Sequence, residues 1–270
     1  MLRVIETSRL VLHEEAEGSR ARRLSQALRR DGTLRNPPVA APLGDGRAVV
    51  LDGANRVTAL TALGIAHAVV QLVDYERSDV TLGAWRHYVR DPGGPGGRRL
   101  RDRAAALPNC AAWSGLEGED DAQLAADLAA ALVLDRGAAV LLGSGAALPE
   151  VAALLRELVA LYRDEAEFYR VDGGDLAALE AEYGPGSLVV FRRFSKDAVL
   201  RLAAGADRLP AGVTRHLIPG RALRLNTPLA WLAAPGPTAG KQEQLDAMLR
   251  RRYIEHGVRH YEESTVLFDE

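Results

Sequence analysis

The sequence predicts a mixed α/β (α+β) protein built in two parts. Over residues 1–91, short apolar runs with strand character alternate with segments of helical periodicity. A run rich in glycine and proline then occupies residues 91–97, where neither a helix nor a central strand is expected. Beyond it the chain is richer in helix. We therefore expect an α/β domain over 1–91 and a helix-rich α/β domain over 98–270.

Each element of the first domain has a local signal. Ser19 is placed to cap a helix that ends at Gly32, and Gly64 is placed to end a helix over 54–63. Asn36-Pro37-Pro38 forces an extended entry into the next strand, and Gly44-Asp45-Gly46 is typical of a hairpin turn. The predicted strands cover residues 2–12 (as one or two strands), 39–43, 47–51, 68–73 and 80–89.

The second domain shows longer periodic segments. An amphipathic pattern predicts a long helix over 148–169. Further elements are a strand over 187–194, a helix over 196–204, a strand over 213–218 and a last helix over 238–256.

Composition argues against several classes of protein. The 270 residues are 47% hydrophobic and 26% charged with a net charge of −2, which is ordinary for a soluble globular protein and unlike a dedicated DNA-binding protein. Cys110 is the single cysteine, so no intrachain disulfide can form, and a reducing cytoplasmic setting is the simplest expectation. The N-terminal residues do not resemble a signal peptide, and no apolar run is long enough to span a membrane.

The segment "VVLDGANRVTAL" joins a strand to a helix through Asp52-Gly53-Ala54-Asn55-Arg56. The first N–H groups of a helix lack intrahelical partners and, with the helix dipole, attract anions. Gly53 permits a tight turn, and the Arg56 guanidinium suits a phosphate or carboxylate. The alternative is purely structural, with Asp52 capping the helix and Arg56 pairing with a nearby acid.

Four motifs in order, "LHEE", "LRNPPV", "VLDGANRVTALTALGI" and "VVQLVDY", resemble the ParB/sulfiredoxin fold over residues 8–76. Within that superfamily they are most similar to the free L-serine kinases, including the branch of serine kinase/regulators from staphyloferrin-type siderophore clusters. "TRHLIPGRALRLNTPLAWL" is similar to the second domain of that branch. Sulfiredoxins need a cysteine at the corner, and this corner has none. The kinases often carry histidines where this chain has Ala54 and Asn55.

The resemblance implies phosphoryl transfer from ATP or ADP, with Mg²⁺, to the hydroxyl of free L-serine. The product, O-phospho-L-serine, would supply a siderophore, 2,3-diaminopropionate or cysteine pathway, and the second domain would complete the substrate cleft. Glu14 is the expected base with Glu15 behind it, and Asp52 is expected to orient magnesium or the serine amino group. Predicted contacts to the nucleotide come from Gly53, Ala54, Asn55, Arg56, Thr33 and Arg35, and predicted contacts to the substrate from Asn36, Arg221, Arg224 and Asn226.

Two other functions stay open from sequence alone. One is a nucleotide-responsive, DNA-binding regulator of ParB type, which the near-neutral charge and the lack of an evident helix-turn-helix do not favour. The other is an inactive sensor that binds a small ligand through the same corner. Each motif also has a structural alternative: His13-Glu14-Glu15 as a polar strand end, and the residues around Arg221 as ordinary surface.

Overall fold

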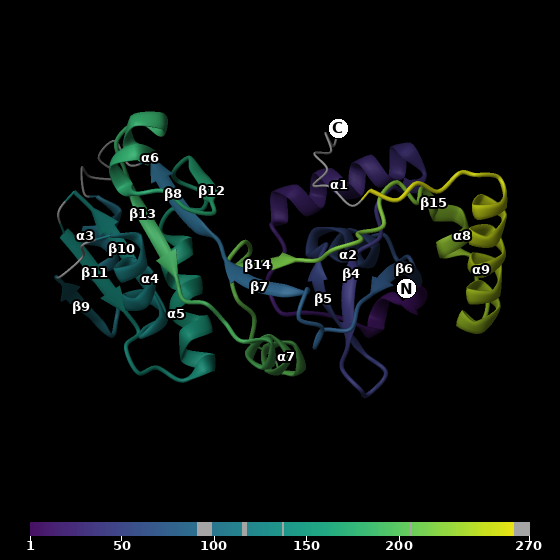
Figure 1. Ribbon diagram of the computed structural model, residues 1–270, viewed down its shortest axis with the longest axis horizontal. Helices are drawn as coiled ribbons and strands as arrows, with labels where there is room; N and C mark the ends of the chain where they lie inside the picture. The colour runs from purple at the N-terminus through teal and green to yellow at the C-terminus, as the bar shows by residue number, and fades with distance from the viewer. Residues whose placement is uncertain (91–98, 115–117, 137, 206, 262–270) are drawn as a thin grey trace. The chain divides into compact units, whose positions relative to one another are not determined.

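The computed structural model describes residues 1–90, 99–114, 118–136, 138–205 and 207–261 (Figure 1). These residues form two compact units. Unit 1 takes residues 1–12, 16–81 and the described part of 217–270, and unit 2 takes residues 13–15 and the described part of 82–216. The expected linker at 91–97 lies outside the described residues. This division differs from a boundary near residue 91, because the chain after Leu217 packs with the N-terminal segments.

Unit 1 is built on a five-stranded mixed sheet in the order β1-β6-β4-β5-β2. β1 and β6 are antiparallel, β6 and β4 parallel, β4 and β5 antiparallel, and β5 and β2 parallel. A separate antiparallel pair joins β3 to β15. The strands are β1 Leu2–Glu6, β2 Leu10–Leu12, β3 Thr33–Leu34, β4 Val39–Pro42, β5 Ala48–Asp52, β6 His67–Leu72 and β15 Thr227–Pro228.

Helices flank this sheet, and their apolar side chains join its core (Figure 1). α1 packs against α2, and α9 packs against β1, where Gln242 accepts a hydrogen bond from the Val4 N–H at 2.8 Å. That contact between distant parts of the sequence is one reason the C-terminal segment belongs to unit 1. The helices are the 3₁₀ turn η1 Thr7–Arg9, α1 Gly18–Asp31, α2 Ala54–Ala62, α8 Leu229–Ala233 and α9 Thr238–Ile254.

The elements predicted for the first domain are present, with small differences at their ends. α1 ends at the left-handed Gly32 (φ 62°) as expected, but its N-cap is Glu17, so Ser19 lies inside the first turn. The predicted strand over 80–89 is two strands, because the backbone N–H of Trp85 turns to the carbonyl of Val213.

Unit 2 contains a six-stranded sheet in the order β12-β8-β13-β10-β11-β9, and every pair in it is antiparallel (Figure 1). A second, two-stranded sheet pairs β14 with β7. The strands are β7 Thr81–Ala84, β8 Arg86–Arg90, β9 Cys110–Trp113, β10 Ala131–Asp135, β11 Ala138–Leu142, β12 Phe168–Val171, β13 Gly186–Phe191 and β14 Thr214–Leu217.

The helices of unit 2 include one correction. The amphipathic segment predicted over 148–169 is helical only to Ala160, and Phe168 begins β12, where its ring lies 4.9 Å from that of buried His87. The helices are α3 Leu100–Ala104, α4 Glu119–Asp127, α5 Leu148–Ala160, α6 Leu176–Tyr183 and α7 Lys196–Ala204. Among the described residues, no helix combines the length and apolar character needed to cross a membrane.

Candidate functional site

The corner between β5 and α2 has the geometry expected of an anion-binding helix start. Gly53 is the N-cap and takes a left-handed backbone (φ 102°), and no side chain caps the helix. The first ladder hydrogen bond runs from the Val57 N–H to the Gly53 carbonyl at 3.0 Å. The N–H groups of Ala54, Asn55 and Arg56 therefore precede the helical ladder. Asp52 does not cap this helix, so the capping half of the structural alternative is wrong.

Asp52 instead binds two guanidinium groups. Its Oδ2 accepts from Arg56 Nη2 at 2.5 Å and from Arg221 Nη2. Burial by itself would raise the pKa of the Asp52 carboxyl, but the charges of Arg56 and Arg221 outweigh it and hold that pKa below its ordinary value. The Asp52 carboxylate is therefore ionised at neutral pH and ties the corner to a segment 169 residues away.

The Arg56 guanidinium makes more hydrogen bonds within the protein than the sequence suggested. Its Nη1 donates to the carbonyls of Asn36 and Pro37, each at 3.1 Å, while its Nη2 holds Asp52. A Cβ at Gly53 would lie 2.9 Å from Arg56 Nε, so this packing requires glycine on steric grounds as well as for its backbone. The Arg56 guanidinium thus fixes the turn before β4, and the backbone N–H groups of Ala54 and Asn55 lie ahead of the helical ladder.

The segment after β14 is held against the same corner by a buried glutamine. Gln71 on β6 donates from Nε2 to the Gly220 carbonyl at 2.9 Å, and its Oε1 accepts from the Ala222 N–H at 2.7 Å. These two bonds flank Arg221 and set its approach to Asp52. Sequence reasoning missed Gln71, because a glutamine inside "VVQLVDY" has no local signal beyond its place in a strand.

Two left-handed residues shape the rest of this segment. Arg224 and Asn226 have φ values of 52° and 51°. In this conformation the Arg224 N–H reaches Asn36 Oδ1 at 2.8 Å, and the Asn226 N–H reaches the Arg35 carbonyl at 3.0 Å. The predicted substrate contacts Asn36, Arg221, Arg224 and Asn226 are thus neighbours within unit 1, whereas the sequence had grouped them only by residue type.

The remaining residues predicted for the nucleotide lie close by in the same unit. Thr33 is in β3 opposite Pro228, and Arg35 pairs with Asp31 at 3.5 Å. Ala54 is the first residue of α2. Asn55 Oδ1 accepts from the Glu17 N–H at 2.8 Å, which joins the start of α1 to the start of α2.

Glu14 lies in unit 2 and is bound on both carboxylate oxygens. Oε2 accepts from the Gly212 N–H at 3.0 Å. Oε1 accepts from the Thr214 N–H at 2.5 Å and from the Thr214 hydroxyl at 2.6 Å. A parallel bridge between Glu14 and Leu209 holds the backbone alongside. The Glu14 side chain is therefore fixed in one orientation by residues near the start of β14.

Thr214 also contacts His13. The His13 ring is 3% exposed, and its Nε2 lies 2.8 Å from Thr214 Oγ1. Since the hydroxyl has one hydrogen and gives it to the Glu14 carboxylate, it accepts from His13, which must carry its proton on Nε2. The order His13, Thr214, Glu14 is a directed hydrogen-bond chain with the carboxylate as its final acceptor.

A second buried histidine, His87, holds the backbone at Gly212, whose N–H binds Glu14. His87 Nε2 donates to the Gly212 carbonyl at 2.9 Å, and its Nδ1 accepts from the Tyr162 hydroxyl at 2.6 Å. Burial lowers the pKa of His87 to about 3, so its ring is neutral at physiological pH. Gly212 is thus held through its carbonyl while its N–H binds Glu14.

Glu15 is less constrained than Glu14. Its carboxylate lies 3.5 Å from Arg163 Nη1 and is about one-third exposed. Arg215, which follows Thr214, stacks over the Trp85 ring at 4.6 Å and pairs with Asp172 at 2.9 Å. The hydroxyl of Thr214 was not predicted, although it precedes the basic pair in "TRHLIPGRALRLNTPLAWL".

Known proteins similar to this chain share one described activity. No known family model matches the chain. An ATP-dependent L-serine kinase from Desulfurococcus mucosus is 25% identical over 230 residues, covering 84% of this chain and 89% of the relative. The ATP-dependent L-serine kinase SbnI from Staphylococcus aureus is 24% identical over 243 residues, covering 86% and 84%. This chain is distantly similar to the free L-serine kinases over most of its length.

Solved structures confirm that the fold of this chain resembles that of these kinases. SbnI with a C-terminal truncation superposes with a TM-score of 0.70 at 21% identity, covering 94% of this chain and 97% of SbnI. A glutamate-to-glutamine variant of a free serine kinase in complex with AMP gives a TM-score of 0.69 at 18% identity, covering 86% and 93%. The predicted mixed α/β fold and the predicted similarity to free L-serine kinases are therefore confirmed, and the roles of individual residues stay predictions.

Proposed function

We propose that this protein is an ATP-dependent L-serine kinase that forms O-phospho-L-serine. The supporting observation is that two relatives described by this activity match most of this chain and most of their own length. We also propose that unit 1 has the ParB/sulfiredoxin fold, which the four ordered motifs suggested. Phosphoryl transfer needs little covalent chemistry from the protein, and its main demands are positioning and charge neutralisation.

The N-terminus of α2 is the proposed phosphate-binding element. No side chain caps its start, and the dipole places partial positive charge there. Arg221 adds a guanidinium held by Asp52 and flanked by the Gln71 hydrogen bonds. Related free serine kinase structures hold AMP or ADP. We therefore assign this corner to the nucleotide phosphates and Asp52 to positioning Arg56 and Arg221.

Glu14 is the proposed base for the serine hydroxyl. A carboxylate with a fixed orientation can take the hydroxyl proton as the oxygen attacks the transferred phosphoryl group. The two N–H groups and the Thr214 hydroxyl supply that orientation. Glu15, beside Arg163, has the weaker set of contacts and is assigned a supporting electrostatic role.

The corner does not form a magnesium site from protein side chains alone. No group of three or more His, Cys, Asp or Glu side chains in the described ranges is placed to hold a metal ion. Asp52 offers a carboxylate, but its Oδ2 already binds two guanidinium groups. Magnesium in such enzymes commonly relies on substrate phosphates and neutralises their charge. The roles proposed for Asp52, Arg221 and Glu14 need no contact to the ion.

The test is direct product detection. Purified protein is incubated with L-serine, magnesium and either ATP or ADP, and O-phospho-L-serine is measured by mass spectrometry together with ADP or AMP. We expect phosphoserine and ADP from the ATP reaction. Glu14→Gln removes the charge of the proposed base. Glu243→Gln makes the same charge change on α9 and is its matched control. Failure to form phosphoserine with both nucleotides would exclude the proposed activity.

A further inference from the structure

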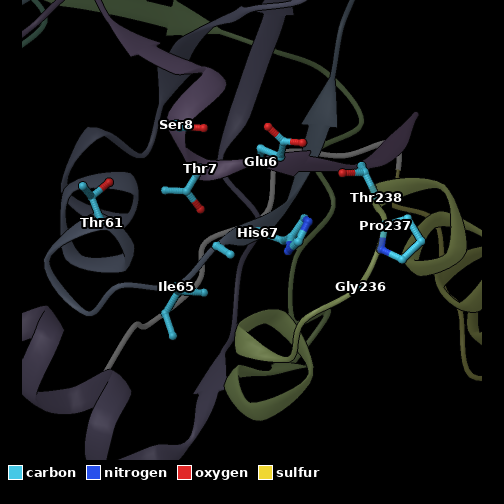
Figure 2. Close-up of a pocket in the computed structure, with 10 residues that line it drawn as sticks. Glu6, Thr7, Ser8, Thr61, Ile65, His67, Gly236, Pro237 and Thr238 are labelled. Carbon is cyan, nitrogen blue, oxygen red and sulfur yellow. The ribbon is translucent and has the colours of Figure 1, made fainter.

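A pocket of about 480 Å³ lies in unit 1 away from the phosphate corner (Figure 2). It is formed where η1, the end of α2, the start of β6 and the start of α9 meet. None of Asp52, Arg56 and Arg221 lines it. A volume of this size is typical of small-molecule sites. Its lining includes Glu6, Thr7, Ile65, His67, Pro237 and Thr238.

Two buried polar groups in the lining lack partners. Thr7 and His67 are each 6% exposed, and neither Thr7 Oγ1 nor His67 Nδ1 has a hydrogen-bond partner among the described residues. Figure 2 shows the His67 ring between Thr7 and Pro237. An unsatisfied buried polar group costs about 1–3 kcal/mol, and such groups often mark a site where a partner binds. The two orphans next to one cavity therefore indicate a polar ligand.

The start of α9 adds a set of aligned donors to the same pocket. Pro237 is the N-cap and offers no side-chain cap, and the first ladder bond is from the Lys241 N–H to the Pro237 carbonyl at 3.2 Å. The N–H groups of Thr238, Ala239 and Gly240 precede it. This helix has 17 residues and carries no acidic residue in its first turn. Its positive end is thus available to an anionic group.

The charges of the lining narrow the ligand class. Glu6 contributes a carboxylate whose Oε2 pairs with Arg9 at 3.2 Å, while no lysine or arginine is among the described residues that line the pocket. A phosphate dianion is generally bound by such cations and would be repelled by Glu6. A zwitterionic ligand suits both charged parts of the pocket, because its carboxylate can bind the N–H groups of α9 and its ammonium can bind Glu6.

We propose that this pocket binds a free α-amino acid as a second ligand, separate from the phosphate corner. The carboxylate binds the first N–H groups of α9, and the ammonium binds Glu6. Ile65 and Pro237 provide apolar contact for a side chain, and Thr7 and His67 line the pocket beside it. This site is independent of the proposed kinase activity, since it uses none of the residues assigned to phosphoryl transfer.

Calorimetry with L-valine tests the proposal in the full-length protein without nucleotide. L-Valine has the zwitterion and an apolar side chain but no hydroxyl to phosphorylate. Thr238→Asp places a carboxylate at the start of α9, where it favours the helix dipole and competes with the ligand carboxylate. Ala147→Asp makes the same charge change at the N-cap of α5 in unit 2 and is the matched control. Glu6→Gln removes the proposed ammonium partner.

We expect L-valine to bind the wild-type protein and Ala147→Asp equally. Binding should weaken about tenfold or more in Thr238→Asp and in Glu6→Gln, the loss expected for one charge-assisted contact. Phosphoserine formation without L-valine should be unchanged in Thr238→Asp. Absence of L-valine binding, equal binding by the wild-type protein and both site variants, or tighter binding of inorganic phosphate would overturn the proposal. If Thr238→Asp fails to fold, Glu6→Gln decides between the same outcomes.

Discussion

Thr214→Val tests whether the orientation of Glu14 matters for phosphoryl transfer. The substitution keeps the shape of the side chain and removes the hydroxyl that joins His13 to Glu14. Thr214 is 7% exposed, so water does not readily replace that hydroxyl. The backbone N–H groups of Gly212 and Thr214 still bind the carboxylate, so Glu14 is loosened rather than released.

The magnitude follows from two hydrogen bonds that the substitution removes. The hydroxyl gives Glu14 Oε1 a hydrogen bond at 2.6 Å, and a bond to a charged group contributes about 1.5–3 kcal/mol. Removal of the hydrogen bond from buried His13 at 2.8 Å adds about 1 kcal/mol. The free energy of unfolding should fall by about 2.5–4 kcal/mol. If about half of that free energy also stabilises the transition state for phosphoryl transfer, its loss lowers kcat roughly tenfold to thirtyfold.

The assay compares kcat and KM for L-serine with the unfolding free energy in urea. KM should change little, because the Thr214 hydroxyl contacts the proposed base and not the substrate. Thr214→Ser keeps the hydroxyl and should retain most of the kcat. Ser187→Ala is a matched deletion in unit 2, since the buried Ser187 hydroxyl has no hydrogen-bond partner among the residues that the structure describes, and it should leave stability equal or slightly higher. An unchanged kcat in Thr214→Val, or equal losses in Thr214→Ser, would refute the reasoning.

Three further predictions concern other contacts. Glu14→Gln should lower kcat about 10²–10⁴-fold, whereas Glu15→Gln should lose much less, as measured by phosphoserine formation; equal losses would contradict the assignment of the base. Gln71→Met should free the Arg221 segment and raise the pKa of Asp52, which ¹³C NMR titration would detect; an unchanged pKa would argue against that coupling. Burial depresses the pKa of His87 to about 3 in the folded protein, so the folded state keeps this ring neutral. The stability that depends on the neutral ring is fully present above about pH 6.5, the ordinary pKa of histidine, and is lost as the pH falls toward 3. In urea unfolding, His87→Phe should flatten that dependence by up to about 1.4 kcal/mol per pH unit, and an unaltered slope would count against it.

Local signals predicted the elements that depend on local chemistry. Helical periodicity and Gly64 predicted α2, and the diproline after Asn36 predicted the entry to β4. The helix over 148–169 was predicted too long, because its apolar spacing continues while Phe168 and Tyr169 pair with β8 instead. An apolar aromatic segment fits a buried strand as well as a helix, and only the neighbouring strand decides between them.

The candidate site was predictable in its residue types and not in its connections. The pairing of Asp52 with Arg56 was one of the alternatives open from sequence, because the two residues lie close together in the chain on either side of the turn at Gly53. No periodicity predicts that Arg221, 169 residues later, binds the same oxygen. That contact needs β15 to pair with β3 and Gln71 to hold Gly220, and both are tertiary events.

Asn55 shows how a departure from a family pattern can have a structural cause. Where the related kinases often have histidine, this chain places an amide whose oxygen accepts the N–H of Glu17 at the N-cap of α1. α1 has no side-chain cap of its own, so Asn55 satisfies one of the groups at its start. The Asn55 side chain therefore joins the two helices, while the Asn55 backbone N–H lies in the first turn of α2. The backbone can therefore serve a phosphate there even though the side chain differs, because the donors of a helix N-terminus do not depend on residue type.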